Sequence, residues 1–261
     1  MKRRRRVRKS AVFVIFVLLL IIALLISIIA KKVSDNQVSE PKQEKTTETK
    51  KENKKKQTNL PKVKKIDQSG DPYENKVTVS DLDSIYILVN KYSGLPEDYE
   101  PSDLVQVPSS GENENVRMRK EAAFEKLIEA ASNEGFILNA CSAYRSYAYQ
   151  TDLFNNGAAS YGEEYADRYW TRPGFSEHQS GLAVDIRMDN DCSDLDAVRY
   201  NSHYNWLLEN MHTYRFILRY PDDKEDKTKI APESWHLRYV GVDLATYLYE
   251  NNLTLDEYYG A

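Results

Sequence analysis

Hydrophobic positions divide the chain into a continuous apolar run, a polar stretch and a mixed remainder. Residues 11–30 carry no charge and are almost all apolar. Residues 31–72 are rich in Lys, Glu, Gln, Asn and Thr and hold few large apolar side chains. In residues 73–261, apolar and polar positions alternate with the periods of helices and strands. The pattern predicts one membrane segment, one linker and one folded domain.

The apolar run has the length of a transmembrane helix. At about 1.5 Å of rise per residue, such a run spans the roughly 30 Å hydrocarbon layer of a bilayer. Residues 1–10 are far more basic than the Lys31-Lys32 pair after the run, so the positive-inside rule places them in the cytoplasm and everything after the run outside. A cleaved signal peptide is the alternative, but its apolar core is usually about 7–15 residues long, and Ile28 stands where a small residue would be expected. We expect an uncleaved single-pass anchor.

Residues 31–72 lack the apolar surface that folding requires. Burial of apolar side chains is what offsets the entropy lost when a chain becomes ordered. We therefore expect a disordered, flexible linker that separates the bilayer from a domain at residues 73–261.

The mixed remainder predicts an α+β domain. Expected helices span residues 117–133, 147–156, 204–211 and 242–251, and a capping-box sequence at 254–257 starts one further turn. Expected strands span residues 85–89, 136–143, 181–187, 216–220 and 235–240. Because these elements interleave without a regular βαβ repeat, we expect a small, mostly antiparallel sheet with flanking helices.

Charge and cysteine content exclude several classes of protein. Residues 73–261 hold 33 acidic against 17 basic side chains, whereas residues 1–72 hold 7 against 19. So acidic a domain repels phosphate backbones, and we expect no nucleic-acid binding. Two cysteines, Cys141 and Cys192, exclude a disulfide scaffold and an all-cysteine zinc site, and the sequence leaves open whether they pair.

Two of the four histidines lie in sequences suited to metal chemistry. His178 precedes a glycine turn and then Asp185 in an apolar strand, so chain reversal can bring imidazole and carboxylate onto one ion. His236 follows Glu233 by three residues. Two His and one Asp leave the fourth position of a tetrahedral zinc open for water, as in catalytic sites. Glu233 is suited to take a proton from that water.

Each of these residues alone has an ordinary structural explanation. A single His at the end of an apolar strand is more often a packed core residue than a ligand, and a single Asp often ends a strand. Taken together with Glu233, these residues are better explained as a metal site, because they supply the ligands and the base that metal-assisted hydrolysis requires. His203 and His212 lie in or near an amphipathic helix that contains Trp, so we predict structural roles for both.

Five motifs in order resemble those of the VanY-type D-alanyl-D-alanine carboxypeptidases, which belong to the wider group of zinc peptidases that includes lysostaphin-like enzymes and the Hedgehog signalling domain. The motifs are Leu88-Val-Asn-Lys, Leu95-Pro-Glu-Asp-Tyr, Ser142-Ala-Tyr-Arg-Ser-Tyr, Ser176-Glu-His-Gln-Ser-Gly-Leu-Ala-Val-Asp and Trp235-His-Leu-Arg-Tyr-Val-Gly. The resemblance covers residues 85–259. The chain departs from the family pattern at Ser234, where Pro is common, and at Arg215, where Gly often precedes Phe. Neither position is an expected ligand.

The resemblance implies a role for each residue of the site. The zinc ligands would be His178, Asp185 and His236. Glu233 would be the catalytic base, and Arg145 would stabilise the negative charge that develops on the scissile carbonyl. Gln150 and Ser176 would line the pocket for the terminal D-residue of the substrate. A guanidinium suits its role, because it stays charged and holds an oxyanion without taking up a proton.

These inferences predict a membrane-anchored zinc D,D-carboxypeptidase with one zinc ion per chain, in a cleft of the domain. It would remove the terminal D-alanine from peptidoglycan stem peptides outside the cell. Two alternatives stay open, namely an L,D-carboxypeptidase that acts on tetrapeptide stems and a zinc-containing module that binds wall peptides without hydrolysis. Glu233 favours an enzyme, since a module that only binds needs no base beside the metal. Endopeptidase action on cross-bridges would need an open groove in place of a pocket.

Overall fold

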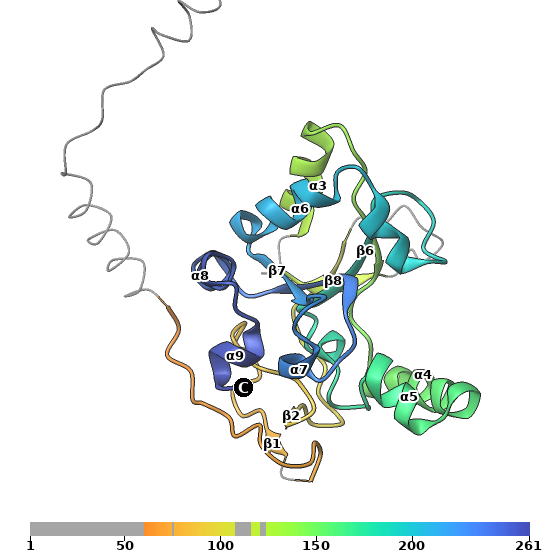
Figure 1. Cartoon of the computed structure of the whole chain (residues 1–261), viewed down its shortest axis with the longest axis vertical. Coiled ribbons are helices and arrows are strands. Elements are labelled where there is room, and N and C mark those ends of the chain that lie inside the picture. Colours follow the sequence, from red (N-terminus) through yellow and green to blue (C-terminus); the bar gives the residue numbers. More distant parts are fainter. Residues whose placement is uncertain (1–59, 75, 108–115, 121–123) are drawn as a thin grey trace, which may run out of the picture. The chain divides into compact units, whose positions relative to one another are not determined.

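The computed structural model describes residues 60–74, 76–107, 116–120 and 124–261 (Figure 1). The predicted basic segment 1–10, the predicted anchor 11–30 and the part of the predicted linker before residue 60 lie outside these residues. Within the described part of the chain, no helix has both the length and the apolarity needed to cross a bilayer.

A four-stranded antiparallel sheet in the order β5-β6-β8-β7 forms the centre of the domain (Figure 1). Its strands are β5 (Asn139–Ser142), β6 (Ala183–Arg187), β8 (Glu233–Tyr239) and β7 (Phe216–Tyr220). Two smaller pairs consist of β1 (Val77–Thr78) beside β2 (Ser93–Gly94), in parallel, and β3 (Leu104–Gln106) beside β4 (Arg117–Arg119), antiparallel. The predicted α+β class and the mostly antiparallel sheet are confirmed.

Helices flank this sheet and agree in large part with the predicted ones. The α-helices are α3 (Phe124–Asn133), α4 (Tyr147–Tyr161), α5 (Glu163–Tyr169), α6 (Tyr204–Asn210), α7 (Glu225–Thr228), α8 (Val242–Asn251) and α9 (Leu255–Tyr259). Short 3-10 helices are η2 (Glu177–Ser180), η3 (Leu195–Tyr200) and η4 (Met211–Tyr214). The helix predicted at 242–251 is confirmed, and Thr254 forms the expected capping box with Glu257. The short helices α5 and α7 were not predicted.

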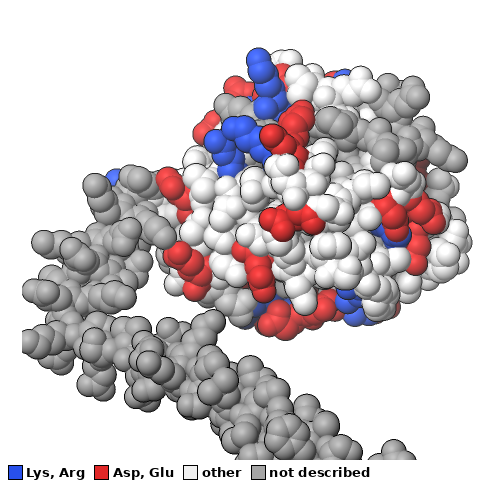
Figure 2. Space-filling view, turned by 90° about the horizontal axis from the view of Figure 1, so that it is seen from above, with Lys and Arg blue, Asp and Glu red and all other residues white. Residues whose placement is uncertain are grey.

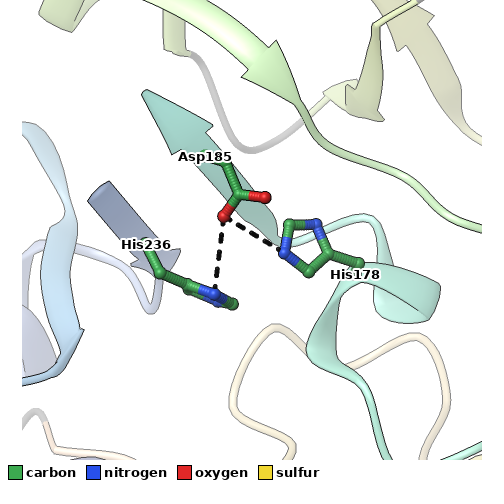
Figure 3. A group of neighbouring side chains, drawn as sticks. All are labelled: His178, Asp185 and His236. Carbon is green, nitrogen blue, oxygen red and sulfur yellow. Dashed lines mark ion pairs between the residues drawn. The ribbon is translucent and has the colours of Figure 1, made fainter. Parts of the chain in front are cut away.

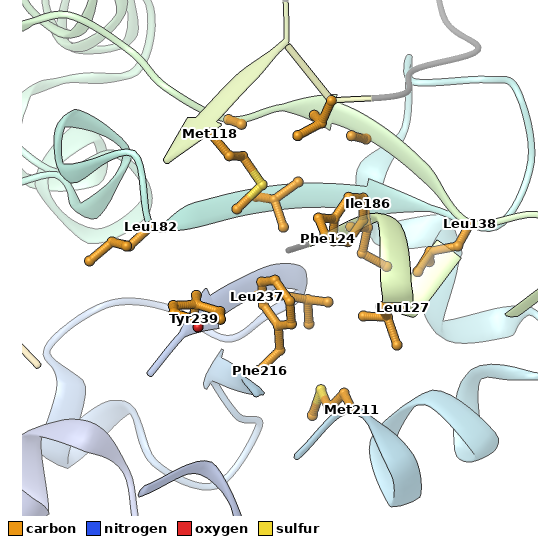
Figure 4. Close-up of a cluster of buried hydrophobic side chains, with 14 of the residues drawn as sticks. Met118, Phe124, Leu127, Leu138, Leu182, Ile186, Met211, Phe216, Leu237 and Tyr239 are labelled. Atoms are coloured by element: carbon orange, nitrogen blue, oxygen red, sulfur yellow. The ribbon is translucent and has the colours of Figure 1, made fainter. Parts of the chain in front are cut away.

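Apolar and polar side chains alternate along the central strands, so one face of the sheet packs on the hydrophobic core and the other face carries the predicted site residues. Ile186 and Leu237 are fully buried and pack with Phe124 and Leu127 of α3 in the main hydrophobic cluster (Figure 4). Because successive side chains of a strand point to opposite faces, Asp185, the neighbour of Ile186, faces away from this cluster. The apolar core thereby fixes the direction of the polar residues on the other face.

Two predicted elements differ from the structure. The helix predicted at 117–133 is wrong at its start, because Arg117–Arg119 pair with β3 as a strand that buries Met118 completely, whereas α3 covers Phe124–Asn133. The strand predicted at 85–89 does not form, although its residues are largely buried. The carbonyl oxygens of Ile85 and Ile87 instead accept hydrogen bonds from Arg238, at 3.1 and 2.7 Å.

Residues 60–72 belong with the folded part of the chain, whereas their composition assigned them to the linker. Leu60, Val63 and Ile66 pack against the hydrophobic cluster that α8 and α9 form. The backbone N–H of Ile66 donates to the carbonyl of Tyr259 at 3.0 Å. These few apolar side chains at short spacing order a segment that is otherwise polar, so the boundary predicted at residue 73 is placed too late.

The domain has a surface rich in carboxylates and one disulfide bond. Carboxylates are spread over the face seen in Figure 2, and the largest visible Lys and Arg side chains lie near its top edge, with smaller basic areas elsewhere on the rim. Cys141 of β5 and Cys192 form a disulfide, with Cα atoms 5.6 Å apart. The pairing that the sequence left open is therefore present, and it ties the loop after β6 to the edge strand of the sheet.

Candidate metal centre and substrate pocket

The register of the central sheet brings two of the predicted ligands together. Asp185 of β6 lies directly opposite His236 of β8 in the antiparallel pairing. Opposed residues in such a pair place their side chains on the same face. His178 comes from η2, which ends at Gly181 in the left-handed conformation (φ 68°). This turn leads into β6 and explains why a glycine lies between the histidine and the aspartate.

The three predicted ligands converge on one point, as Figure 3 shows. Asp185 Oδ1 lies 3.3 Å from His178 Nε2 and 3.6 Å from His236 Nδ1. One ligand atom from each residue lies within 4.8 Å of the others, and all three side chains are buried. His203 and His212 lie outside this group. His203 stacks on Phe136, and His212 stacks on Tyr249.

A polar group outside the three-residue group lies beside the outer nitrogen of each imidazole ring, through a hydrogen bond for His178 and an ion-pair contact for His236. His178 donates from Nδ1 to the carbonyl of Ala143 at 2.6 Å, which leaves the lone pair of Nε2 directed at Asp185. His236 places Nε2 3.7 Å from the carboxylate of Glu177 and so turns Nδ1 toward Asp185. Partners of this kind on the outer nitrogen are typical of histidines that bind metals.

Unsatisfied polar atoms show that the group suits a cation. Buried polar atoms almost always have a hydrogen-bond partner. Within the described residues, His178 Nε2 and Asp185 Oδ1 are both buried and have none. Two imidazole nitrogens and a carboxylate oxygen are the donors of many catalytic zinc sites. The residues present therefore fit a zinc ion.

The electrostatics of the group are those of a metal site. Burial and the charge of Arg145 lower the pKa of His178 to about 4, so its ring is neutral at pH 7. Burial would also lower the pKa of His236, but Glu177 and Glu233 outweigh it and raise that pKa to about 9. A metal that binds Nδ1 of His236 must therefore displace a proton. Burial raises the pKa of Glu233.

All seven residues predicted for the site line one cavity of about 120 Å³. The other lining residues are Tyr169, Trp170, Thr171, Leu195, Tyr220, Ile230 and Trp235. Glu233 lies at its wall with Oε2 3.0 Å from His236 Nδ1. Gln150 donates from Nε2 to the carbonyl of Thr171 at 2.8 Å, and its buried Oε1 has no hydrogen-bond partner among the described residues. Its amide is thus fixed in orientation and keeps one acceptor for a ligand.

Arg145 lies beside the metal group. Its Nη2 lies 3.5 Å from Asp185 Oδ2, and its Nε is buried without a hydrogen-bond partner among the described residues. The backbone N–H of Arg145 donates to the carbonyl of His178 at 3.2 Å, which ties the loop after β5 to η2. The guanidinium therefore has a donor available for a group in the cavity.

The sequence analysis did not predict a role for Glu177, whose carboxylate lies beside the outer nitrogen of His236. This carboxylate has no exposed surface and accepts hydrogen bonds from Arg219 at 2.8 Å and from Arg238 at 2.6 Å. Burial would raise the pKa of Glu177, but the two guanidinium groups hold it well below its ordinary value. A signal was present in the sequence, since both arginines lie inside apolar strands and a buried arginine requires a partner.

Comparisons with known proteins agree with this geometry. The VanY family, described as D-alanyl-D-alanine carboxypeptidase, matches residues 113–242. One similar protein is YodJ of Bacillus subtilis (strain 168), which is named as a carboxypeptidase. It is 43% identical over 189 residues, which cover 70% of this chain and 69% of YodJ.

Two solved structures extend the comparison to three dimensions. The LdcB LD-carboxypeptidase is 38% identical with a TM-score of 0.65, over 75% of this chain and 93% of that one. The vancomycin resistance D,D-pentapeptidase VanY, solved in complex with Zn(II), is 34% identical with a TM-score of 0.57, over 66% and 97%. Its bound metal agrees with the His, Asp and His group found here. The chain therefore belongs to the VanY family of D-alanyl-D-alanine carboxypeptidases, which are zinc peptidases.

Proposed function

We propose that the chain is a zinc D,D-carboxypeptidase that removes D-alanine from the end of peptidoglycan pentapeptides. The observation that supports hydrolysis is the position of Glu233, whose carboxylate lies 3.0 Å from His236 Nδ1 at the wall of the cavity. The choice of the D,D bond is supported by the match to the D-alanyl-D-alanine carboxypeptidase family. Three ligands and an adjacent carboxylate are what metal-assisted hydrolysis requires. A module that bound wall peptides without hydrolysis would have no use for this carboxylate.

The proposal assigns one zinc ion per chain to His178, Asp185 and His236. When bound, zinc would lower the pKa of a water molecule to about 7 and polarise the scissile carbonyl. Glu233 takes a proton from the attacking water and passes it to the amine of the departing D-alanine. The raised pKa of Glu233 suits a group that holds this proton between the two steps.

Arg145 and the far wall of the cavity are assigned to the substrate. The guanidinium of Arg145 stabilises the negative charge that develops on the scissile carbonyl oxygen. Gln150 and Ser176 bind the terminal D-residue, and both side chains are almost fully buried. The cavity of about 120 Å³ is smaller than the roughly 300–1,000 Å³ of pockets that take drug-sized ligands, so it suits a small group such as one terminal residue. Such a volume favours removal of one terminal residue over cleavage inside a long chain.

An L,D-carboxypeptidase that acts on tetrapeptides is the second candidate. The resemblance to the LdcB LD-carboxypeptidase, with 38% identity and a TM-score of 0.65, favours it. The metal group, Glu233 and Arg145 act on the carbonyl and are indifferent to the residue before it. Preference must therefore come from the pocket wall that meets the penultimate residue, and exclusion of about one methyl group is worth only roughly 1–3 kcal/mol. We expect partial discrimination in favour of the pentapeptide.

The test is a competition between two defined substrates. Purified enzyme with zinc is incubated with pentapeptide and tetrapeptide at equal concentration, and mass spectrometry follows the loss of D-alanine from each. Faster loss from the pentapeptide supports the proposal. Consumption of the tetrapeptide with the pentapeptide left intact makes the chain an L,D-carboxypeptidase, and cleavage of neither contradicts both assignments.

We also propose that residues 11–30 anchor the enzyme in the cell membrane, with its catalytic domain outside. The support is the length of the apolar run and the basic residues before it. Protease added to intact cells should cut in the polar stretch between residues 33 and 59 and release an active fragment. Recovery of the whole domain in the culture medium, with a new N-terminus near residue 31, would identify the run as a signal peptide.

A further inference from the structure

Four aromatic side chains form a continuous patch on α4 and α5. Tyr161 ends α4, and Tyr165, Tyr169 and Trp170 follow on or just after α5. The ring centroids of Tyr161 and Tyr165 are 5.2 Å apart, and those of Tyr165 and Tyr169 are 4.4 Å apart. Trp170 lies 6.0 Å from Tyr161. These four residues are called the aromatic patch below.

Much of this patch is open to solvent. Tyr161 is 64% exposed and Tyr165 is 45% exposed, which is unusual for two large rings in contact. Exposed clusters of aromatic residues commonly mark binding surfaces. Figure 1 shows α4 and α5 side by side at the edge of the domain, away from α8 and α9.

A glycine in the middle of α4 holds the indole of the patch in place. Gly157 lies inside the helix, where glycine costs roughly 1 kcal/mol relative to alanine. A Cβ at this position would lie 2.6 Å from Cε3 of Trp170. The absence of a side chain at this position therefore lets the indole approach the helix closely, and the same indole contacts Tyr161 and lines the cavity.

The patch is continuous with the substrate cavity. Tyr169 and Trp170 belong both to the patch and to the lining of the cavity. Gln150 lines the same cavity from α4, and Tyr161 follows eleven residues later on that helix. At about 1.5 Å per residue, the two positions are roughly 16 Å apart along the helix axis. Five extended residues span at most about 17 Å, so a pentapeptide with its carboxyl end in the cavity can bring its amino end to Tyr161.

We propose that the aromatic patch binds the sugar rings of the glycan to which the stem peptide is attached, an inference that rests on the proposed action on wall peptides. The amino end of a stem peptide is the end that joins the glycan. One face of a pyranose ring presents C–H groups, which pack favourably on the electron-rich face of an aromatic ring. Tyrosine hydroxyls at the edges of the same rings can hydrogen-bond sugar hydroxyls.

Charge argues against a lipid surface as the occupant. Glu163 and Glu164 are exposed at the start of α5, between Tyr161 and Tyr165 in the sequence. Anionic headgroups repel such carboxylates. A neutral sugar has no such conflict, and its hydroxyl groups can donate hydrogen bonds to both carboxylates.

The test compares one peptide with and without its sugars. The full chain with zinc is assayed for D-alanine release from a free pentapeptide and from the same pentapeptide joined to N-acetylglucosaminyl-N-acetylmuramic acid. We expect kcat/KM to be at least about fivefold higher for the sugar-bearing substrate. Tyr161→Ala and Tyr165→Ala should each reduce that preference about two- to tenfold and leave kcat/KM for the free pentapeptide unchanged.

Two control variants separate ring stacking from general disturbance. Tyr161→Phe keeps the ring and should keep most of the preference. Tyr249→Ala removes a tyrosine of similar exposure, 47% against 45% for Tyr165, from α8 and should leave the preference intact.

Three results would overturn the glycan subsite. One is equal kcat/KM for both substrates in the wild-type enzyme, and another is a preference that survives in Tyr161→Ala and Tyr165→Ala. The third is an equal loss on both substrates in these variants, which would make the patch a peptide site.

If neither substrate is hydrolysed, the proposed carboxypeptidase function fails, and calorimetry with the peptide-free disaccharide decides the subsite alone. Binding that Tyr161→Ala weakens would support it, and no binding by the wild-type chain would overturn it.

Discussion

His236 Nε2 lies 3.7 Å from the carboxylate of Glu177, and this contact turns Nδ1 of the same ring toward Asp185. Glu177 also neutralises the guanidinium groups of Arg219 and Arg238, and all three of these charged side chains have no exposed surface. Asp256, which is also fully buried, is a second partner of Arg219. Glu177 therefore lies beside a metal ligand, is the carboxylate paired with Arg238, and shares the compensation of Arg219 with Asp256.

Glu177→Ala should destabilise the fold strongly. Removal of one partner from a buried ion pair leaves an uncompensated charge and typically costs about 3–5 kcal/mol. The free energy of unfolding in urea measures this loss. Glu225→Ala is the matched control, because its pair with Arg168 is exposed and such pairs contribute only about 0–1 kcal/mol. An equal decrease in the free energy of unfolding in both variants would show that the buried ion pairs of Glu177 contribute no more to stability than an exposed ion pair.

Most of the site could be predicted from the sequence, because residues that lie close together in one motif also lie close together in the fold. His178 and Asp185 are separated by a glycine turn and half a strand, so their convergence follows from local structure. His236 is 51 residues further along the chain than Asp185, and only the register of β6 with β8 shows that the two residues are opposed. That register depends on tertiary packing, which a single sequence does not display.

The parts that sequence reasoning missed depend on long-range contacts. The run at 85–89 has the composition of a strand, but its carbonyl groups bind Arg238 and no neighbouring strand. Residues 60–72 have the composition of a linker, but a few apolar side chains pack on α9. The helix predicted at 147–156 continues to Tyr161, and Gly157 within this extension makes room for the indole of Trp170.

Loss of the disulfide should destabilise the domain and spare the chemistry. Cys141 and Cys192 are 51 residues apart, and closing a loop of this length restricts the unfolded chain by about 4 kcal/mol. The double variant Cys141→Ala, Cys192→Ala should therefore unfold at a lower urea concentration. Neither cysteine lines the cavity, so D-alanine release by the folded variant should stay within about twofold of wild type. An unchanged unfolding midpoint would contradict a stabilising role.

Asp167 should give the fold a pH-dependent contribution to stability. Its carboxylate accepts hydrogen bonds from Lys91 Nζ at 2.8 Å and Arg172 Nε at 3.0 Å. Burial would raise its pKa, but these partners outweigh burial and lower the pKa below its ordinary value of 3.8. A folded pKa below the unfolded one means that this stability is present above about pH 4 and is lost as the pH falls through the folded pKa.

Asp167→Asn should therefore lower the free energy of unfolding at pH 7 by about 1–3 kcal/mol. The difference from wild type should shrink as the pH approaches about 2. Urea unfolding at both pH values measures it. Asp226→Asn changes a carboxylate on the surface and should leave the unfolding midpoint unchanged at pH 7. A difference between Asp167→Asn and wild type that stays constant with pH would contradict the assignment.

Arg145→Lys should slow the enzyme on every substrate by a similar factor. The guanidinium acts on the carbonyl that all substrates share, and loss of an oxyanion donor of this kind commonly costs about 100-fold in kcat. Rates of D-alanine release from pentapeptide and tetrapeptide provide the comparison. Arg117→Lys, at an exposed arginine outside the cavity, is the control. A loss on only one of the two substrates would make Arg145 a specificity residue.

Zinc content and D-alanine release, measured on the same preparations of wild type, Asp185→Ala and Glu233→Ala, test the central claim most directly. Wild type should contain about one zinc per chain. Asp185→Ala should lose metal and activity together, because it removes a ligand from the group of three. Glu233→Ala should keep its zinc and lose activity by about 100-fold or more, since it removes only the base. Full zinc occupancy in Asp185→Ala, or a wild-type rate in Glu233→Ala, would contradict the account.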